Sequence, residues 1–527
     1  MLNKKKTVTI ILILICALQL GVSLFWASKK CYLFQDEFFT YAASNRLEGI
    51  SADFPVNEWL DEEWIYDYVV ASSEHKFDYS IPYHNQDKDV HPPLYYMFVH
   101  TASSLIPDEF SYWAGIGFNI VFFIGCTIVL YFLGKELFAS KGCGLLVAFL
   151  FSISFGGLNT MVFVRMYMLM TLLILLHTYV YIKYMGKEEV PLKGYLFLVL
   201  TMAAGALTQY YFLIAAFFLA AWYTIQFIVK KQYKKLGKYL VSIAASAGIS
   251  LAVYPTMWKH IFSSGRGVEA RENFSAAGGY LANLKTMWNL LDSQLFTNLF
   301  KVVLLGLLAL AVIYFVREKK VNKEFLLKAG AITFGCLGYF FIVTKVAPYQ
   351  IDRYLMPIYP LVYLLVIGGI FCLMGKIIPA KAAAVLCILG FGGLSAIHIV
   401  HSGIPYTYER NQGIQNRNAL AEKYSDNYAV YIGEQQDISP YYDVMQVLTE
   451  YKGYYNISDL TSVSEIQSDM ELLQDESQVV LYINKNMNDE IDKVYELIET
   501  VLPETSMNEE CRIARDEKWH VYLLNLE

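Results

Sequence analysis

The sequence predicts an all-α membrane protein: a polytopic bundle of about eleven transmembrane helices with a large first extracytoplasmic loop and a small soluble α/β domain at the C-terminus. Of its 527 residues, 56% are hydrophobic and only 17% are charged, whereas an ordinary soluble domain carries about 25% charge. The apolar residues form blocks of about 17–25 residues, the length that crosses the hydrocarbon core as a helix. These blocks must be helical, because lipid offers no partner to a backbone N–H or C=O.

The predicted spans are the successive apolar blocks. They lie at residues 7–27, 110–133, 143–158, 161–182, 194–209, 211–229, 239–254, 295–316, 329–344, 354–374 and 382–399. The first follows three lysines, as a signal peptide would, but it is long for such a segment and no A-x-A-like cleavage site follows it. We therefore interpret it as an uncleaved first span.

The orientation follows from the lysines and arginines of the short loops, which concentrate on the cytoplasmic side. If the N-terminus is cytoplasmic, every inner loop is basic, and the C-terminal domain is extracytoplasmic. The basic residues of these loops are Lys135, Lys141, Lys183, Lys187, Lys193, Lys230, Lys231, Lys234, Lys235, Lys238, Arg317, Lys319, Lys320, Lys323, Lys328, Lys376 and Lys381. The chain is thus predicted to be a multi-pass protein of the cell membrane.

Two domains are predicted. Residues 1–400 form the transmembrane domain, in which residues 28–109 are an acidic extracytoplasmic loop. Aromatic residues in this loop predict helices lying on the membrane surface; they are Trp59, Trp64, Tyr66 and Tyr68. Residues 401–527 form the α/β domain, since short β-like runs alternate with helical patterns. The runs are 429–432, 479–483 and 520–524, and the helical patterns are 441–451 and 488–501.

Two classes of function are disfavoured by composition. No basic tract lies outside the inner loops, so nucleic acid is not an expected partner. The eight cysteines show neither a CxxC pair nor a zinc-type spacing with histidine.

The first candidate for chemistry is the acidic pair Asp36-Glu37, directly after the first span and among Phe34, Phe38 and Phe39. A carboxylate in such surroundings is suited to act as a general base. The alternative is an ordinary acidic surface loop.

The second candidate is the segment DVHPPLYY at residues 89–96. Two prolines fit the first turn of a helix, which would place His91 near a helix N-terminus, where anions are favoured. The alternative is a helix start that happens to use His and Pro. Asp87-Lys88-Asp89 also has the DxD form that can bind a divalent metal in soluble glycosyltransferases, and that interpretation stays open.

Several cations are predicted near the outer ends of the spans. They are Arg165, Lys345 and Arg353, and the outer turn with Gln209 and Tyr210 lies at the same depth. Each could be a snorkelling or interfacial residue. Together they could bind a lipid phosphate, which arginine holds in a bidentate manner. His177, deeper in the fourth span, is interpreted as a packing residue.

The order of these motifs resembles the GT-C superfamily of membrane glycosyltransferases, and within it the protein-O-mannosyltransferase family and its bacterial relatives, including the lipid A aminoarabinose transferase. The resemblance covers about residues 1–400 and rests on Asp36-Glu37, the 89–96 segment, Arg165-Met166-Tyr167 and the RYLMP segment at 353–357.

The resemblance implies transfer of a sugar from a polyprenyl-phosphate donor to an acceptor hydroxyl outside the cytoplasm, with inversion. Asp36 would be the base, with Glu37 beside it, and His91 and Arg353 would hold the donor phosphate. Arg165 and Lys345 would assist; the residues before Arg165 lack the polar neighbours that many relatives show. Substrate contacts are expected from Asp89, Tyr95, Tyr96, Gln209 and Tyr210.

This reaction needs no sugar nucleotide on the outer side, and a divalent metal stays open as a cofactor. The expected partners are the lipid-linked donor, membrane lipid and a glycan, lipid or protein acceptor. The rival interpretation is a lipid or glycan transporter without transferase activity. Transporters place polar residues at the bilayer midplane and often contain internal repeats, whereas here the polar residues gather near one surface and no repeat is evident.

Overall fold

A computed structural model describes residues 4–47, 49, 56–276, 278–318, 322–433, 444–503, 505, 507–515 and 518–526. The chain forms two compact units. Unit 1 comprises Met1–Lys30, Gln86–Ala102 and Tyr112–Thr407, and unit 2 comprises Cys31–Asn85, Ser103–Ser111 and Tyr408–Glu527. Each unit is described separately below.

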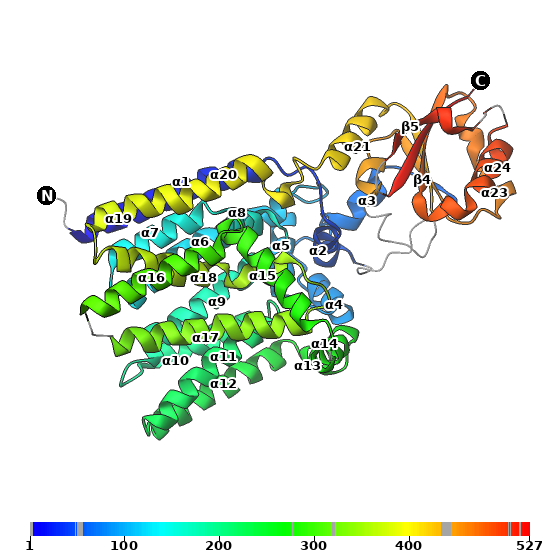
Figure 1. The fold of residues 1–527 in the computed structure, drawn as a ribbon. Helices are drawn as coiled ribbons and strands as arrows, with labels where there is room; N and C mark the ends of the chain where they lie inside the picture. Colours follow the sequence, from blue (N-terminus) through cyan, green and yellow to red (C-terminus); the bar gives the residue numbers. More distant parts are fainter. Residues whose placement is uncertain are drawn as a thin grey trace. The chain divides into compact units, whose positions relative to one another are not determined.

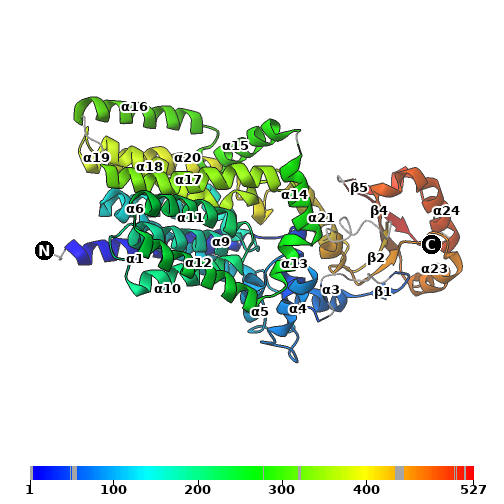
Figure 2. The same cartoon turned by 90° about the horizontal axis from the view of Figure 1, so that it is seen from below.

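Unit 1 is a bundle of long apolar helices that run side by side (Figures 1 and 2). In the described part of the chain, nine helices are long and apolar enough to cross a membrane, or ten if one bent pair counts as a span. The chain is a multi-pass membrane protein. The main helices are α1 (Lys4–Ala27), α6 (Trp113–Phe138), α9 (Tyr167–Val180), α11 (Phe212–Val229), α12 (Tyr233–Val253), α16 (Phe300–Glu318), α17 (Lys323–Val346), α18 (Tyr359–Met374), α19 (Ala380–Cys387) and α20 (Gly393–Ser402).

The interior of the bundle is built around α9, whose span is 78% buried, whereas α16 lies at the periphery with 6% buried. Small residues permit close packing. A Cβ atom on Gly134 of α6 would stand 2.8 Å from the Cα of Gly144 in α7 (Lys141–Ser152). Close approach of helix backbones at glycine is the usual way in which membrane helices associate.

The third predicted span is a bent pair rather than one helix. α7 and α8 (Phe155–Val162) meet at 55°. The break occurs at Ser154, whose Oγ accepts a hydrogen bond from the N–H of Gly157 at 3.1 Å and so caps α8. A hydropathy profile does not detect this break, because a single serine hardly changes the mean hydropathy of an apolar run. The fifth predicted span, α10 (Leu192–Ala206), is apolar but short.

Shorter helices connect the spans of unit 1. They are α4 (Ser80–Lys88) and α5 (Leu94–Ser103), both of which begin or end in unit 2, α13 (Met257–Phe262), α14 (Gly265–Ser275), α15 (Tyr280–Phe296), and the 3₁₀ turns η2 (Asp352–Tyr354), η3 (Met356–Ile358) and η5 (Pro405–Thr407). Lys319 and Lys320, which belong to the predicted basic loops, lie outside the described residues.

Unit 2 contains a six-stranded mixed sheet with the order β1-β3-β2-β4-β6-β5. Strand β2 is parallel to β3 and β4, and the remaining pairs are antiparallel. The strands are β1 (Trp59–Leu60), β2 (Tyr428–Ile432), β3 (Gly453–Ile457), β4 (Gln478–Asn484), β5 (Arg512–Arg515) and β6 (Trp519–Asn525). The three predicted strands are therefore confirmed as β2, β4 and β6.

Helices cover both faces of this sheet (Figure 1). α23 (Val463–Asp469) and α24 (Ile491–Val501) pack on one face, where Val430, Leu481 and Tyr522 join the core. α21 (Gln412–Lys423) lies on the other face. The predicted helix at 488–501 is confirmed by α24. Of the predicted helix at 441–451, residues 444–448 are helical and 441–443 lie outside the described residues.

The first loop supplies part of unit 2, with α2 (Gln35–Asn45), α3 (Glu62–Val69) and β1. The prediction that Trp59 belongs to a surface helix is wrong. Trp59 pairs with Tyr455 in the sheet, and its indole Nε1 donates to the carbonyl of Asp469 at 2.9 Å. A two-residue strand has no periodicity to read, so tertiary contacts decide its structure.

Replacement of Trp59 by Ala should loosen the sheet edge. The indole packs against Tyr428 and Tyr455 at ring distances of 5.0 and 5.3 Å, so we expect a loss of about 2–4 kcal/mol of stability in unit 2. Hydrogen exchange at the β3 amides should accelerate accordingly. Leu472→Ala, at a side chain that is 49% exposed, is the control; equal exchange in both variants would contradict a structural role for β1.

Candidate functional site

An acid–imidazole pair lies between α4 and α5. Nδ1 of His91 is 2.8 Å from Oδ2 of Asp89, and both side chains keep about a fifth to a quarter of their surface exposed, at 21% and 25%. Burial acts to raise the pKa of Asp89, but His91 and Arg165 outweigh it and hold the pKa below its ordinary value. Because Asp89 occupies Nδ1, the ring is oriented with Nε2 as the nitrogen for a ligand.

A buried arginine supports this pair. Arg165 lies between α8 and α9 and is 6% exposed, and its Nη1 donates to the hydroxyl of Tyr96 in α5 at 3.2 Å. Since Arg165 also lowers the pKa of Asp89, the arginine, the carboxylate and the imidazole share one electrostatic environment. A guanidinium this deeply buried requires such compensation.

Neighbouring hydrogen bonds fix the helix that carries Tyr96. The hydroxyl of Tyr95 donates to Oδ1 of Asn119 in α6 at 3.2 Å, and Nδ2 of Asn119 donates to the carbonyl of Phe163 at 2.8 Å. Phe163 lies two residues before Arg165. Tyr95 therefore ties α5 to the same link that positions the arginine.

Side chains from the α12–α13 connection and the 208–211 turn border the pair. Oδ1 of Asp87 accepts a hydrogen bond from Thr256 at 2.7 Å, and the hydroxyl of Tyr210 is 2.9 Å from Nδ1 of His260. Burial raises the pKa of Tyr210, and the charges of Asp89 and Asp87 raise it further, so its hydroxyl stays neutral. Sequence reasoning missed Thr256 and His260, because single polar residues in a loop form no pattern.

A second polar cluster surrounds Asp352 and Arg353. Oδ1 of Asp352 accepts from the hydroxyl of Tyr406 at 2.9 Å, and Oδ2 accepts from the amides of Asn159 and Gln294, each at 3.3 Å. Burial raises the pKa of Asp352, and the hydrogen bond from Tyr406 and the charge of Arg353 offset it only in part. This carboxyl group, which the sequence did not single out, anchors the turn η2.

Arg353 is 8% exposed, and its guanidinium carbon lies 5.6 Å from the ring of Tyr354. The ring of Tyr354 in turn meets Tyr211 edge-on at 5.5 Å. Arg353 also acts on the pKa of Tyr211, where it opposes the larger upward effect of burial. Arg353 therefore lies beside the turn that contains Tyr210.

The remaining predicted residues of unit 1 have other contacts. Nζ of Lys345 donates to the carbonyl of Ala276 and lies 5.4 Å from the ring of Tyr280, so it contacts the α14–α15 region. Gln209 is buried, and its backbone closes the turn through bonds to Gly205 and Phe212. Hydrogen bonds thus join Asp89 to His91 and Arg165 to Tyr96, and charge effects link Arg165 and Tyr210 to Asp89. Lys345 contacts a different segment.

Asp36 and Glu37 begin α2 in unit 2. Glu37 is fully buried, and its Oε2 accepts a hydrogen bond from the N–H of Phe34 at 2.9 Å, as in a capping box. Asp36 is partly buried. The sequence did not indicate this cap, because the residue at the helix start is Phe34 rather than Ser or Thr.

The C-terminal part of unit 2 fixes the chain just before Asp36. The N–H of Leu33 donates to Oε1 of Gln446 at 2.8 Å, and Nε2 of Gln446 donates back to the carbonyl of Leu33 at 2.9 Å. The amide of Gln446 thus makes with Leu33 the two hydrogen bonds that a neighbouring strand would make. The C-terminal tail therefore positions the start of α2.

Within the described residues, no group of three or more His, Cys, Asp or Glu side chains is arranged to hold a metal ion. Asp87 and Asp89 of the DxD segment face different partners, Thr256 and His91. Nδ1 of His177 is 2.9 Å from the hydroxyl oxygen of Thr201 inside the bundle. This contact agrees with a packing role for His177.

Comparison with known proteins gives a match at the level of fold. No protein-family model matches the chain, and no curated protein matches its sequence. The apo crystal structure of ArnT from Cupriavidus metallidurans aligns with 99% of this chain and 98% of its own, at 10% identity and a TM-score of 0.50. The chain therefore has the same fold as this ArnT structure, and the predicted fold class is confirmed.

Two further structures align at lower scores. ArnT from the same organism bound to undecaprenyl phosphate matches at 11% identity with a TM-score of 0.47, covering 97% of each chain. The archaeal oligosaccharyltransferase AglB from Archaeoglobus fulgidus matches at 10% identity with a TM-score of 0.48, covering 95% of this chain and 71% of AglB.

The raised pKa of Asp352 predicts a pH-dependent stability. The folded chain binds this proton more tightly than the unfolded chain does, so stability is highest below the ordinary aspartate pKa of about 4 and falls as the pH rises through the folded-state pKa. Asp352→Asn cannot ionise and should remove this part of the decline in thermal unfolding temperature. An unchanged slope in the variant would contradict the assignment.

Proposed function

We propose that the chain is a glycosyltransferase of the extracytoplasmic membrane face, which moves a sugar from a polyprenyl-phosphate donor to an acceptor hydroxyl. The observation that carries this proposal is the joining of Asp89, His91, Tyr96 and Arg165 in one electrostatic cluster within a GT-C fold. The proposed extracytoplasmic location rests on the basic inner loops, which favour a cytoplasmic N-terminus and an extracytoplasmic unit 2.

The cluster is suited to a phosphate leaving group. The guanidinium N–H groups of Arg165 and the Nε2 of His91 supply hydrogen bonds to phosphate oxygens, and Asp89 keeps the imidazole oriented. Arg353 adds a second buried cation, beside Tyr211. As the bond from C1 to the phosphate oxygen breaks, its electron pair moves to the phosphate, and these groups stabilise the growing charge. Lys345 is a weaker candidate, because its ammonium group binds the carbonyl of Ala276 and lies over the ring of Tyr280.

Asp36 is the proposed base. It takes the proton of the acceptor hydroxyl while that oxygen forms its bond to C1 from the face opposite the phosphate, so the configuration inverts. The capping bond of Glu37 favours a structural role for Glu37 and leaves Asp36 as the better base. Tyr95, Gln209 and Tyr210 remain proposed substrate contacts or supports.

Replacing each of the two neighbouring carboxylates by its amide separates the role of the base from that of the helix cap. Asp36→Asn should lower kcat by about 10²–10⁴-fold, the usual contribution of a positioned base. Glu37→Gln keeps an oxygen for the N–H of Phe34 and should retain most activity. Transfer is measured on purified chain in nanodiscs with a radiolabelled polyprenyl-phosphate sugar, and Asp67→Asn at an exposed position is the control. Full activity in Asp36→Asn would remove the base assignment.

The phosphate role of the cluster is tested with Arg165→Lys, which keeps the charge and loses the planar fork. We expect kcat to fall by about 10²–10³-fold. Asp89→Asn should show a smaller loss, because the imidazole stays but loses its orienting partner, by about 10–100-fold. Undiminished transfer in both variants would contradict the phosphate role of the cluster. Uptake of lipid-linked sugar into vesicles without any transfer would favour the transporter instead.

A further inference from the structure

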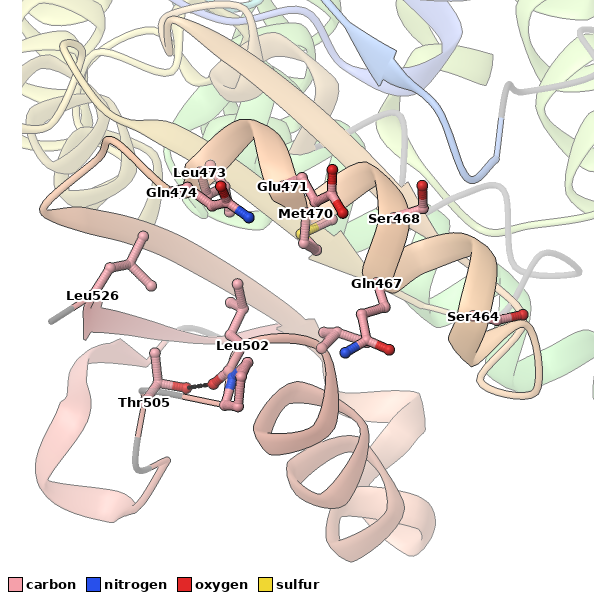
Figure 3. Close-up of a pocket in the computed structure, with 12 residues that line it drawn as sticks. Ser464, Gln467, Ser468, Met470, Glu471, Leu473, Gln474, Leu502, Thr505 and Leu526 are labelled. Carbon is pink, nitrogen blue, oxygen red and sulfur yellow. Dashed lines mark hydrogen bonds between the residues drawn. The ribbon is translucent and has the colours of Figure 1, made fainter.

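Two hollows among the described residues of unit 2 differ in the chemistry of their lining. The first, of about 630 Å³, lies between the α23–η6 segment (η6, Met470–Leu473) and the residues after α24 (Figure 3). Figure 3 shows Gln467 and Glu471 on one side of the gap and Leu502 and Leu526 on the other. Its lining mixes amide and hydroxyl groups, and Glu471 is the one charged residue among the lining residues that the structure describes.

The second hollow, of about 840 Å³, lies between α21 and the strands β5 and β6, with Tyr32 and Phe34 at its border. We refer to it as the α21 groove. Its described lining contains the cations Arg417, Lys423 and Lys518 and no carboxylate. Trp519 and Val521 alternate with the core residues of β6 and so face this side of the sheet.

Arg417 is held by aromatic rings in the groove. Its guanidinium carbon lies 4.7 Å from the ring of Trp519 and 5.7 Å from the ring of Tyr32. Tyr32 itself meets Tyr408 edge-on at 5.0 Å. A guanidinium stacked on ring faces keeps its N–H groups in its own plane and has little rotamer freedom left to lose on binding.

The asparagines of the groove also favour donation. Oδ1 of Asn411 accepts from the N–H of Ile414 at 3.1 Å to cap α21, and Oδ1 of Asn416 accepts from Gln412 at 2.7 Å. With both amide oxygens engaged, the NH₂ groups are the parts suited to a ligand. The asparagine, arginine and lysine side chains of the groove therefore all present donors, which suits an anionic ligand rich in oxygen.

We propose that the α21 groove binds an anionic glycan, with its phosphate or carboxylate groups on Arg417, Lys423 and Lys518 and its sugar rings against the half-buried Phe34 and Tyr408. Aromatic faces bordered by donors favour a saccharide over a plain polyanion, because a ring face packs on the apolar side of a sugar. That this glycan is the acceptor of transfer rests on the proposed function; the binding itself does not.

Binding is measured with the full-length chain in nanodiscs, using the inactive Asp36→Asn variant so that no turnover intervenes. The probes are carboxymethyl-dextran, neutral dextran of the same length and polyglutamate of the same charge. We expect carboxymethyl-dextran to bind at least about tenfold more tightly than either comparison polymer, a difference of about 1.4 kcal/mol. Equal binding of neutral dextran or of polyglutamate would overturn the proposal.

The site is located with the double variant Lys423→Gln/Lys518→Gln, which should weaken binding of carboxymethyl-dextran at least about fivefold. Lys493→Gln, at an exposed position on α24, is the matched charge control, and Gln467→Ala tests the hollow of Figure 3. Loss of binding in Gln467→Ala, or none in the double variant, would contradict the assignment. If the groove binds but wild-type chain transfers no sugar, the proposed function fails while the groove stands.

Discussion

The exclusion of uncompensated charge from the hydrocarbon determines where chemistry can occur in this protein. Long apolar helices satisfy their backbone internally, and ionisable side chains then collect at helix ends, where partners and water are available. Arg165 shows the consequence most clearly. It is 6% exposed, and Tyr96 and the charge of Asp89 compensate it. Because these partners come from separate segments, the arginine also fixes how α5 meets the α8–α9 link.

The need to compensate buried charge also explains why Asp89 and Asp352 of unit 1 differ. Asp89 has the cationic Arg165 as a neighbour, and the pKa of Asp89 falls despite burial. Asp352 is held by a phenol and two amides, and its pKa rises despite the adjacent Arg353. One carboxyl group therefore stays ionised and orients an imidazole, whereas the other stabilises a turn. Environment, rather than residue type, assigns their roles.

The C-terminal segment of unit 2 positions the part of the first loop that bears Asp36. The paired bonds between Leu33 and Gln446 fix the chain ahead of Asp36, and β1 brings the first loop into the sheet. The carboxylate of Glu37 closes the first turn of α2. The loop that bears the proposed base is consequently part of a folded domain, and its geometry depends on residues more than 400 positions away, as the separation of 413 between Leu33 and Gln446 shows.

Periodicity and hydropathy predicted the bundle, three strands and α24, because each of these elements is long enough to carry its own pattern. They missed β1, which has two residues, and the break at Ser154, which is one cap in an apolar run. Asp89, His91 and Arg165 could be selected as candidates from their types and depth. Their pairing with Tyr96, and the contributions of Thr256, His260 and Gln446, depend on contacts between distant segments that no local pattern encodes.

The central claim is that the cluster of Asp89, His91, Tyr96 and Arg165 binds the phosphate of a lipid-linked sugar. The most direct test is a cryo-electron microscopy structure of the chain in nanodiscs containing polyprenyl phosphate. The account predicts phosphate density within hydrogen-bond distance of Arg165 and of the His91 Nε2. A phosphate bound away from both residues, with the cluster unchanged, would contradict it.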